Sequence, residues 1–361
     1  MKKFFLLLIA VPLLLASCGG DKDNSQASAE NKKSEEKTVE NKKVKMILDL
    51  DTGVDDAMAL AYAIGSPNIE LIGVTTVYGN VSRDTSIKNT LALLDLLGKK
   101  DIPVYAGNDR PTGAKEAYKV DQIVEEIHGK NGIGNIEIPA STRSVEKESA
   151  MDFMIESAKK YGKDLYIVAT GPETNLAQVI KKDPKFGEQV GKIVVMGGAL
   201  IVEGNMNHYA EANIFNDPVA SNEVFTSNTP FTMVGLDVTH RTTLTKADTQ
   251  KWRELGTASG KAFADIVDYY ITWETTHQPV LTGCALHDPL AVAVAVHPEF
   301  VTTLKLPMKV GTTKEDWGRT IADTGKLNDP NAANVEVAVD VKVKDFVDNF
   351  NTTLTELFSK H

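Results

Sequence analysis

The chain has 361 residues, with 39 lysines and arginines against 49 aspartates and glutamates, which gives a formal net charge of −10. This acidic balance argues against nucleic acid as a partner, because phosphate backbones are bound by basic surfaces. The length suits one large domain or two ordinary ones.

The N-terminal segment has the pattern of an export signal. Residues 1–17 combine two lysines, an apolar run from Phe4 to Leu15 and small residues, as in a secretory signal peptide. The apolar run is short for a membrane-spanning helix. The sequence "LASC" resembles a bacterial lipobox, which implies cleavage before Cys18 and lipidation of its thiol; an ordinary secreted protein is the alternative. We therefore expect an exported protein, lipid-anchored to the periplasmic or cell-surface face of a bacterial membrane.

Residues 18–43 are predicted to be a flexible tether that carries the lipid. From Gly19 to Lys43 there is no aromatic residue, and Val39 is the one large aliphatic residue. Such a segment buries too little apolar surface to offset its ordering entropy. The folded domain is then expected at 44–361. It has no internal disulfide if Cys18 carries lipid, so its stability must come from a sizeable core.

From residue 44 onward, apolar strands alternate with helical patterns. Strands are predicted at 44–50, 69–79, 102–107, 164–170, 192–198 and 230–238. Helices are predicted at 56–65, 86–98, 173–182 and 218–227, and 244–297 is mainly helical. Strand-like runs follow at 303–310, 318–323 and 334–341, then a helix at 344–360. This alternation predicts an α/β fold: one large domain with an open, mostly parallel sheet and helices on both faces.

Polar side chains follow several predicted strands at the point where each ends. They are Asp49, Asp51, Asp55 and Asp56 after the first strand, Asn80 after the second, Thr170 after 164–170 and Asn205 after 192–198. Ligands of open α/β sheets bind at the carboxyl ends of the strands. We therefore expect these side chains to gather at one edge of the sheet.

Four aspartates within eight positions, at 49, 51, 55 and 56, need a physical explanation. Carboxylates this close raise one another's pKa unless a cation or hydrogen-bond donors hold them. Helix capping and compensation of the helix dipole account for one or two of them. A hard cation that prefers oxygen ligands accounts for more. Phosphatases of the haloacid-dehalogenase type also place Asp-x-Asp after a strand, so that alternative stays open at this point.

Two later segments add further polar groups. "CALHDPLAVAVAV" places His287 and Asp288 before an apolar helix, a position that capping alone would explain. "NMNHYAEANIFNDPVAS" contains Asn205, Glu211 and Asn213. Asparagine and glutamate side chains can hold vicinal hydroxyls by hydrogen bonds, although polar loops are common.

A glycine-rich segment is a candidate flap over a ligand. "IHGKNGIG" (127–134) places three glycines around His128 and a lysine. Such a loop can close over a bound ligand, and a plain connecting loop is the alternative. It does not fit a phosphate-binding P-loop, because the glycine spacing differs and no Gly-Lys-Ser/Thr follows.

Taken in order, these motifs resemble one known family. "DLDTGVDDAMAL", "VYGN", "IHGKNGIG", "ATGPETNLA", "AEANIFNDPVA" and "HDPLAVA" are similar to the motifs of inosine-uridine-preferring nucleoside hydrolases, from about Lys45 to about Val341. Thr52 stands where that family usually has proline, at a position that shapes the turn. The resemblance implies an open α/β sheet with a tightly bound calcium ion at its edge. The implied activity is calcium-dependent hydrolysis of the N-glycosidic bond of ribonucleosides to free base and ribose.

The resemblance also implies roles for individual residues. Calcium ligands would be Asp51, Asp56, the backbone carbonyl of Thr170 and Asp288, with Asp51 also the general base. Ribose would be bound by Asp55, Asn205, Glu211 and Asn213, with Asn80 orienting water and sugar. His287 would protonate the leaving base, and His128 would lie on the flap. Candidates for stacking on the base are Tyr269, Tyr270, Trp273 and Trp317.

Two other functions fit the same residues. One is a lipoprotein that binds nucleosides without cleaving them, and the other is a hydrolase of a different riboside. The pattern does not set a purine or pyrimidine preference. Relatives are commonly dimers or tetramers, so we expect a homo-oligomer.

Overall fold

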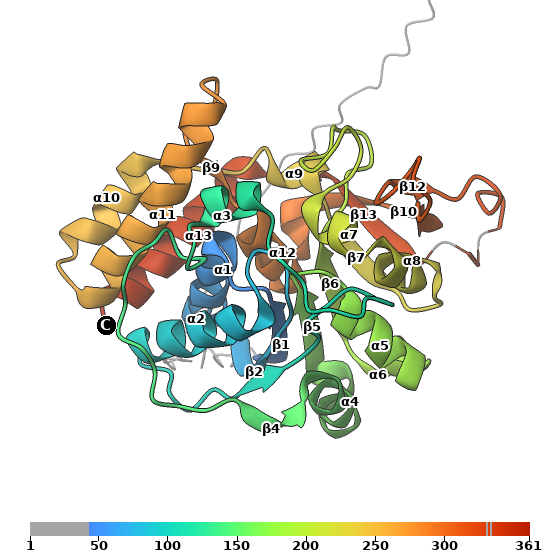
Figure 1. The fold of residues 1–361 in the computed structure, drawn as a ribbon, viewed down its shortest axis with the longest axis horizontal. Coiled ribbons are helices and arrows are strands. Elements are labelled where there is room, and N and C mark those ends of the chain that lie inside the picture. The colour runs from blue at the N-terminus through green and yellow to red at the C-terminus, as the bar shows by residue number, and fades with distance from the viewer. Residues whose placement is uncertain (1–42, 330, 333) are drawn as a thin grey trace, which may run out of the picture. The chain divides into compact units, whose positions relative to one another are not determined.

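The architecture is organised around one large sheet with helices on both faces (Figure 1). The computed structural model describes residues 43–329, 331–332 and 334–361. The predicted signal peptide, Cys18 and all of the tether except Lys43 lie outside the described residues. No helix within the described part of the chain combines the length and apolar character needed to cross a membrane.

Nine strands of the described residues form the main sheet, in the order β10-β13-β7-β6-β5-β1-β2-β3-β4. Their bounds are β1 Val44–Leu50, β2 Ile69–Thr76, β3 Val104–Ala106, β4 Glu146–Ser149, β5 Leu165–Ala169, β6 Lys192–Met196, β7 Phe231–Val234, β10 Val301–Leu306 and β13 Val335–Val341. All neighbouring pairs are parallel except β10 with β13. Two small antiparallel pairs join β8 (Thr243–Leu244) to β9 (Cys284–Ala285) and β11 (Met308–Val310) to β12 (Thr320–Ala322).

The order in which strands are added reverses at β1. The chain first adds β2, β3 and β4 on one side, and then adds β5, β6 and β7 on the other. Strand β1 therefore pairs with both β2 and β5. In open α/β sheets the crevice at such a reversal is the usual ligand site. Asp51 follows β1 and Thr170 follows β5, so both residues lie at this point.

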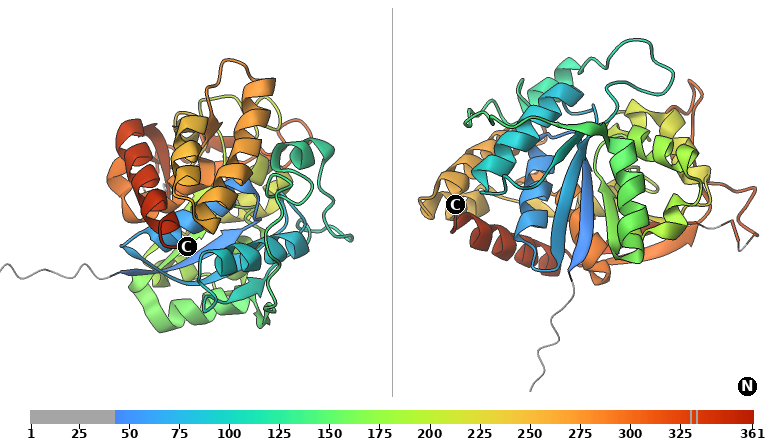
Figure 2. Two further views of the ribbon diagram at one scale, coloured as in Figure 1. Left: turned by 90° about the vertical axis from the view of Figure 1, so that its left-hand side faces the viewer. Right: turned by 90° about the horizontal axis from the view of Figure 1, so that it is seen from below.

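Helices cover the two faces and enclose two apolar cores. Their bounds are α1 Val54–Gly65, α2 Arg83–Leu96, α3 Gln122–His128, α4 Ala150–Tyr161, α5 Thr174–Lys182, α6 Phe186–Gln189, α7 Ala212–Asn216, α8 Pro218–Thr226, α9 Leu236–Thr239, α10 Lys246–Glu254, α11 Ala258–His277, α12 His287–Val296 and α13 Val343–Phe358. Successive side chains of a strand point to opposite faces. Leu48 of β1 belongs to the core that contains residues of α1, α12 and α13, whereas Ile47 belongs to the core that contains residues of α4, α5 and α8. The right-hand view in Figure 2 shows the two helical layers.

The predicted fold class is confirmed, and two predicted strands need correction. The segment 230–238 is a strand only to Val234, and α9 follows. The Asp237 carboxylate accepts hydrogen bonds from the Leu200 and Ile201 backbone amides at 2.9 and 2.8 Å, which holds this helical turn outside the sheet. The run 303–310 divides between β10 and β11 at Pro307, which lacks the N–H that a continuous ladder needs.

Three elements lie in 108–163, where the pattern had predicted none: α3, β4 and α4. Strand β4 reads "EKES" and is largely exposed at the sheet edge, so it carries no apolar signal. Polar edge strands of this kind protect a sheet against further pairing. Helix α4 does carry a signal, because Ala150, Met154 and Ala158 recur every fourth residue and are buried.

Candidate active site

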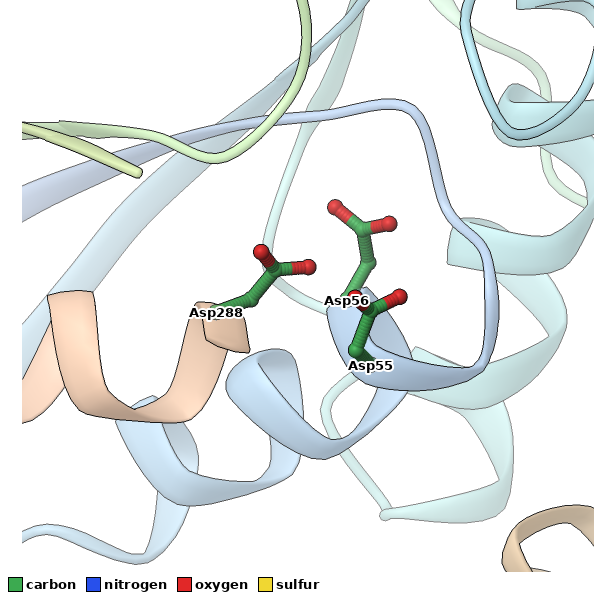
Figure 3. A group of neighbouring side chains, drawn as sticks. All are labelled: Asp55, Asp56 and Asp288. Carbon is green, nitrogen blue, oxygen red and sulfur yellow. The ribbon is translucent and has the colours of Figure 1, made fainter. Parts of the chain in front are cut away.

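Three buried carboxylates converge at the carboxyl edge of the sheet. Asp55 and Asp56 lie in the first turn of α1, and Asp288 lies in the first turn of α12. One oxygen from each carboxylate lies within 4.8 Å of the others. Figure 3 shows the three side chains directed toward one another from the two helix ends. Helix N-termini favour negative charge, which offsets part of the mutual repulsion.

The carboxylates of this group are only partly satisfied by the protein. Asp55 Oδ1 and Asp288 Oδ2 are buried and have no hydrogen-bond partner within the part of the chain that the structure describes. Burial raises the pKa of Asp55 and of Asp56 to about 6, and burial together with Asp55 and Asp56 raises the pKa of Asp288 well above its usual range. Unpartnered buried carboxylate oxygens are the donor set that a hard divalent cation such as calcium requires. The residues therefore fit such an ion.

Asp51 lies beside this group and is held by Asn80. The Asn80 backbone N–H donates to Asp51 Oδ2 at 2.6 Å, and Asn80 Nδ2 donates to Oδ1 at 3.4 Å. Burial, followed by the neighbouring Asp56, raises the pKa of Asp51 well above its usual range. The backbone also closes on this carboxylate, because a Cβ at Gly79 would lie 2.0 Å from Oδ2. Asp51 is thus fixed in place from several sides.

Thr170 contacts the cluster through its hydroxyl and contacts Asn213 through its backbone carbonyl. Its hydroxyl donates to Asp56 Oδ1 at 2.7 Å. Its backbone carbonyl, predicted to be a metal ligand, accepts a hydrogen bond from Asn213 Nδ2 at 2.7 Å. A carbonyl oxygen has two lone pairs, so one stays available.

Asp49 does not join the cluster, contrary to the expectation that it gathers with the other polar side chains at the edge of the sheet. It is a residue of β1, which continues to Leu50. Its Oδ1 accepts hydrogen bonds from Thr75 Oγ1 at 2.7 Å and from Asn175 Nδ2 at 2.8 Å. Asp49 therefore ties β1 to β2 and α5 instead of facing the ligand crevice.

A cavity of about 300 Å³ opens above the carboxylates. It is lined by nine of the predicted site residues: Asp55, Asn80, His128, Thr170, Asn205, Glu211, Asn213, His287 and Asp288. Of the four candidate aromatics, Tyr270 and Trp273 line it. Tyr269 instead donates its hydroxyl to the Glu126 carbonyl, and Trp317 donates Nε1 to the Phe215 carbonyl. The fold therefore brings residues from distant parts of the sequence to one cavity.

Glu211 and Asn213 are oriented by the start of α7. Glu211 accepts hydrogen bonds from the backbone amides of Gly198, Asn213 and Ile214 at 2.9 to 3.2 Å. The Asn213 amide nitrogen donates to the Thr170 and Met196 carbonyls at 2.7 and 3.1 Å. The Asn213 Oδ1 is thereby free to accept a hydrogen bond from a hydroxyl in the cavity.

Two buried histidines face the cavity as neutral rings. His128, at the end of α3, accepts a hydrogen bond from the Val54 backbone amide at Nδ1, and burial lowers its pKa to about 4. His287 Nδ1 lies 2.7 Å from the Thr239 hydroxyl. Burial, and then the neighbouring His240 and His128, lower the pKa of His287 to about 3. Both rings therefore act as hydrogen-bonding groups rather than as cations at neutral pH.

Comparison with known proteins decides the family. The family model described as inosine-uridine preferring nucleoside hydrolase matches residues 46–348. The chain belongs to this family. It is therefore an enzyme, a nucleoside hydrolase, and the phosphatase alternative is excluded.

Solved and curated relatives agree with this assignment. A purine-preferring ribonucleoside hydrolase from Gardnerella vaginalis is 51% identical with a TM-score of 0.86, covering 88% of this chain and 100% of that one. Uridine nucleosidase 1 of Arabidopsis thaliana is 37% identical over 78% of this chain and 82% of its own length. A pyrimidine-specific ribonucleoside hydrolase of Enterobacter sp. (strain 638) is 35% identical over 84% of this chain and 95% of its own. These named relatives differ in their base preference.

Sequence reasoning missed part of the cavity of this nucleoside hydrolase. His240, Glu274 and Gln278 also line it. His240 follows α9, and its ring lies 5.5 Å from that of His287. Glu274 and Gln278 lie at the end of α11, where their spacing is that of any amphipathic helix. No local signal marks such residues, because their role depends on where the helix packs.

Proposed function

We propose that this nucleoside hydrolase cleaves the N-glycosidic bond of ribonucleosides in a calcium-dependent reaction, giving free base and ribose. The observation that carries the proposal is the group of Asp55, Asp56 and Asp288, whose carboxylate oxygens lie within 4.8 Å of one another beside the cavity. Two of these carboxylates have an oxygen that no group of the described residues satisfies. A cation and a sugar diol are the partners that such oxygens lack.

The family resemblance implies a set of calcium ligands, and two of them, Asp56 and Asp288, belong to this group of three carboxylates. Asp51 and the carbonyl of Thr170 complete that implied set. A bound calcium ion would supply positive charge that offsets these carboxylates and lowers the pKa of a water molecule.

Asp51 is the proposed general base. Its carboxylate, fixed by Asn80, accepts a proton from the water that attacks the anomeric carbon. Positive charge develops on the ribose ring in an oxocarbenium-like transition state. Asp55, Asn205, Glu211 and Asn213 hold the ribose hydroxyls, and the anionic groups among them favour that charge.

His287 is the proposed donor to the leaving base. When the Thr239 hydroxyl donates to Nδ1, the hydrogen of the neutral ring lies on Nε2. That N–H can donate a hydrogen bond to a nitrogen of the base as the glycosidic bond breaks, which stabilises the negative charge on the departing base while the ring keeps its proton. His128, held by the hydrogen bond that its Nδ1 accepts from the Val54 amide, lines the same cavity.

A ribose-release assay tests this function directly. The protein is incubated with inosine, guanosine, adenosine, uridine and cytidine, and free ribose is measured with and without a chelator. We expect release that falls when calcium is stripped. Nucleoside binding without ribose release would support a nucleoside-binding lipoprotein. Ribose release only from some other riboside would support a hydrolase of that different riboside.

We further propose that Cys18 is lipidated and anchors the exported enzyme to a bacterial membrane, and that the enzyme is a homo-oligomer. The pattern of residues 1–17 supports export, and the "LASC" sequence supports lipidation of Cys18. Radiolabelled palmitate should enter the wild-type chain and not Cys18→Ala. Light scattering of the purified protein should give the mass of a dimer or tetramer. A monomer mass would contradict the proposal that the enzyme is a homo-oligomer.

A further inference from the structure

The cavity has a second half that the reaction chemistry above does not use. Its sugar half contains the carboxylates and amides already described. Its other half is lined by α3, α11 and the segment before β9, and includes Val124, Ile127, Tyr270, Trp273 and Leu281. An apolar and aromatic surface of this kind suits a flat heterocycle. We call it the base half. Glu274 is the one acidic side chain that lines it among the described residues.

Helix α11 places Glu274 one turn beyond the sugar half. Tyr270, Glu274 and Gln278 are spaced by four residues, so they share one side of the helix and its end. The Tyr270 ring lies 5.5 Å from the His128 ring, and His128 Nδ1 is 3.8 Å from Asp55 Oδ1. Tyr270 therefore marks the boundary with the sugar-binding carboxylates. Four residues of helix advance the chain by about 6 Å, so Glu274 lies one helical turn along α11 from this boundary and lines the same cavity.

The Glu274 carboxylate has spare hydrogen-bonding capacity. Its one side-chain partner among the described residues is Gln278 Nε2, at a long 3.4 Å. Of the residues that the structure describes, no lysine or arginine lines the cavity. The side chain is half-buried, and its two carboxylate oxygens have lone pairs that no strong donor among the described residues engages. A ligand that brings N–H groups to this position would satisfy it.

We propose that Glu274 reads the Watson–Crick edge of the base and selects guanosine. Guanine presents two neighbouring donors, N1–H and the N2 amino group, which match the two oxygens of one carboxylate. Hypoxanthine and uracil offer a single ring N–H on this edge. Adenine and cytosine place an acceptor nitrogen beside their amino group. This nitrogen would lie against a carboxylate oxygen, and two acceptors repel each other. This inference rests on the proposed function, because it requires that the nucleoside place its base in this half.

Guanosine and inosine form the decisive pair, since they differ only in the N2 amino group. We expect kcat/KM of the wild-type enzyme to favour guanosine by about 10- to 100-fold, the range of a hydrogen bond to a charged group. In Glu274→Gln the amide offers one acceptor and one misplaced donor. Its guanosine kcat/KM should fall by about the same factor, while its inosine value changes little, so the ratio approaches one. The matched control is Glu254→Gln at the exposed end of α10, which should leave the ratio unchanged.

A binding readout separates this inference from the proposed function. Calorimetry with free guanine and hypoxanthine should show tighter guanine binding to the wild type and similar binding of both to Glu274→Gln. Should no nucleoside release ribose, the proposed function fails, and calorimetry with intact guanosine and inosine still decides the role of Glu274. Equal preference of the wild type for guanosine and inosine, or an unchanged ratio in a folded Glu274→Gln, overturns the inference. The wild-type comparison stands even if that variant does not fold.

Discussion

Asn80 binds both oxygens of the Asp51 carboxylate, with its backbone N–H 2.6 Å from Oδ2 and its side-chain Nδ2 3.4 Å from Oδ1. The two residues follow the neighbouring strands β1 and β2, so the parallel pairing of those strands sets this contact. One residue thereby orients the carboxylate that we propose as the general base. The same Nδ2 also donates to Asp56 Oδ2 at 3.1 Å, which links the base to the carboxylate cluster.

Asp51→Asn should remove catalysis while keeping the fold. An amide of the same shape cannot accept the proton of water, so we expect ribose release to fall by about 10²- to 10⁴-fold. Initial rates with a soluble nucleoside and a circular dichroism spectrum check this. Asp84→Asn, at an exposed position in the first turn of α2, is the control and should keep full activity. Near-native turnover in Asp51→Asn would rule out its role as base.

Gly79→Ala should misplace the same carboxylate without any change of charge. The new Cβ would lie 2.0 Å from Asp51 Oδ2, a distance that forces the carboxylate or the loop to move. We expect a loss of kcat of about 10²-fold, since small displacements of catalytic groups are that costly. Gly113→Ala is a useful comparison, because no atom lies within 4 Å of its added Cβ. Equal activity of the two variants would show that the backbone of Gly79 does not constrain Asp51.

Glu173 makes the stability of the protein depend on pH. This residue precedes α5 and is fully buried, its Oε1 has no hydrogen-bond partner among the described residues, and burial raises its pKa to about 8. The folded state therefore holds a proton that the unfolded state releases near pH 4.5, so ionisation destabilises the fold progressively as pH rises from about 4.5 to about 8.

Glu173→Gln cannot ionise and should escape this effect. We expect its free energy of unfolding to exceed that of the wild type by roughly 2–4 kcal/mol at pH 8.5, and the difference to shrink toward pH 5. Denaturant titrations at the two pH values measure it. Glu223→Gln, at an exposed position of α8, should show no such pH-dependent gain. A gain of the same size at both pH values would mean that ionisation of Glu173 is not its cause.

His287→Ala should affect substrates according to their leaving group. A nucleoside base needs a hydrogen bond or proton as it departs, whereas p-nitrophenol leaves readily without one. We expect inosine hydrolysis to fall by about 10²-fold or more and p-nitrophenyl riboside hydrolysis by much less. The activity of the wild type should not require a protonated His287 in the resting enzyme, since its pKa is lowered to about 3. Equal losses on both substrates would remove the role of His287 as donor.

The sequence allowed much of the sugar half to be predicted, because those residues follow strands or begin helices. Asp51, Asp55 and Asp288 stand at ends of elements that a parallel sheet must bring to one edge. Glu274 and His240 could not be found in this way, since their places in the cavity depend on how α11 and the end of α9 pack. Glu173 looks like an ordinary residue at a helix start, and its burial beside Ser221 of α8 follows from the packing of the fold.

The most direct test of the central claim compares ribose release with calcium content in one preparation. The wild type is stripped with a chelator and assayed with inosine and guanosine before and after calcium is restored, with Asp288→Asn treated in parallel. We expect the stripped wild type to be inactive and to regain activity as about one calcium ion binds per chain. We expect Asp288→Asn to regain neither ribose release nor bound calcium. Full ribose release by calcium-free wild type, or calcium binding without any release from either nucleoside, would contradict the account.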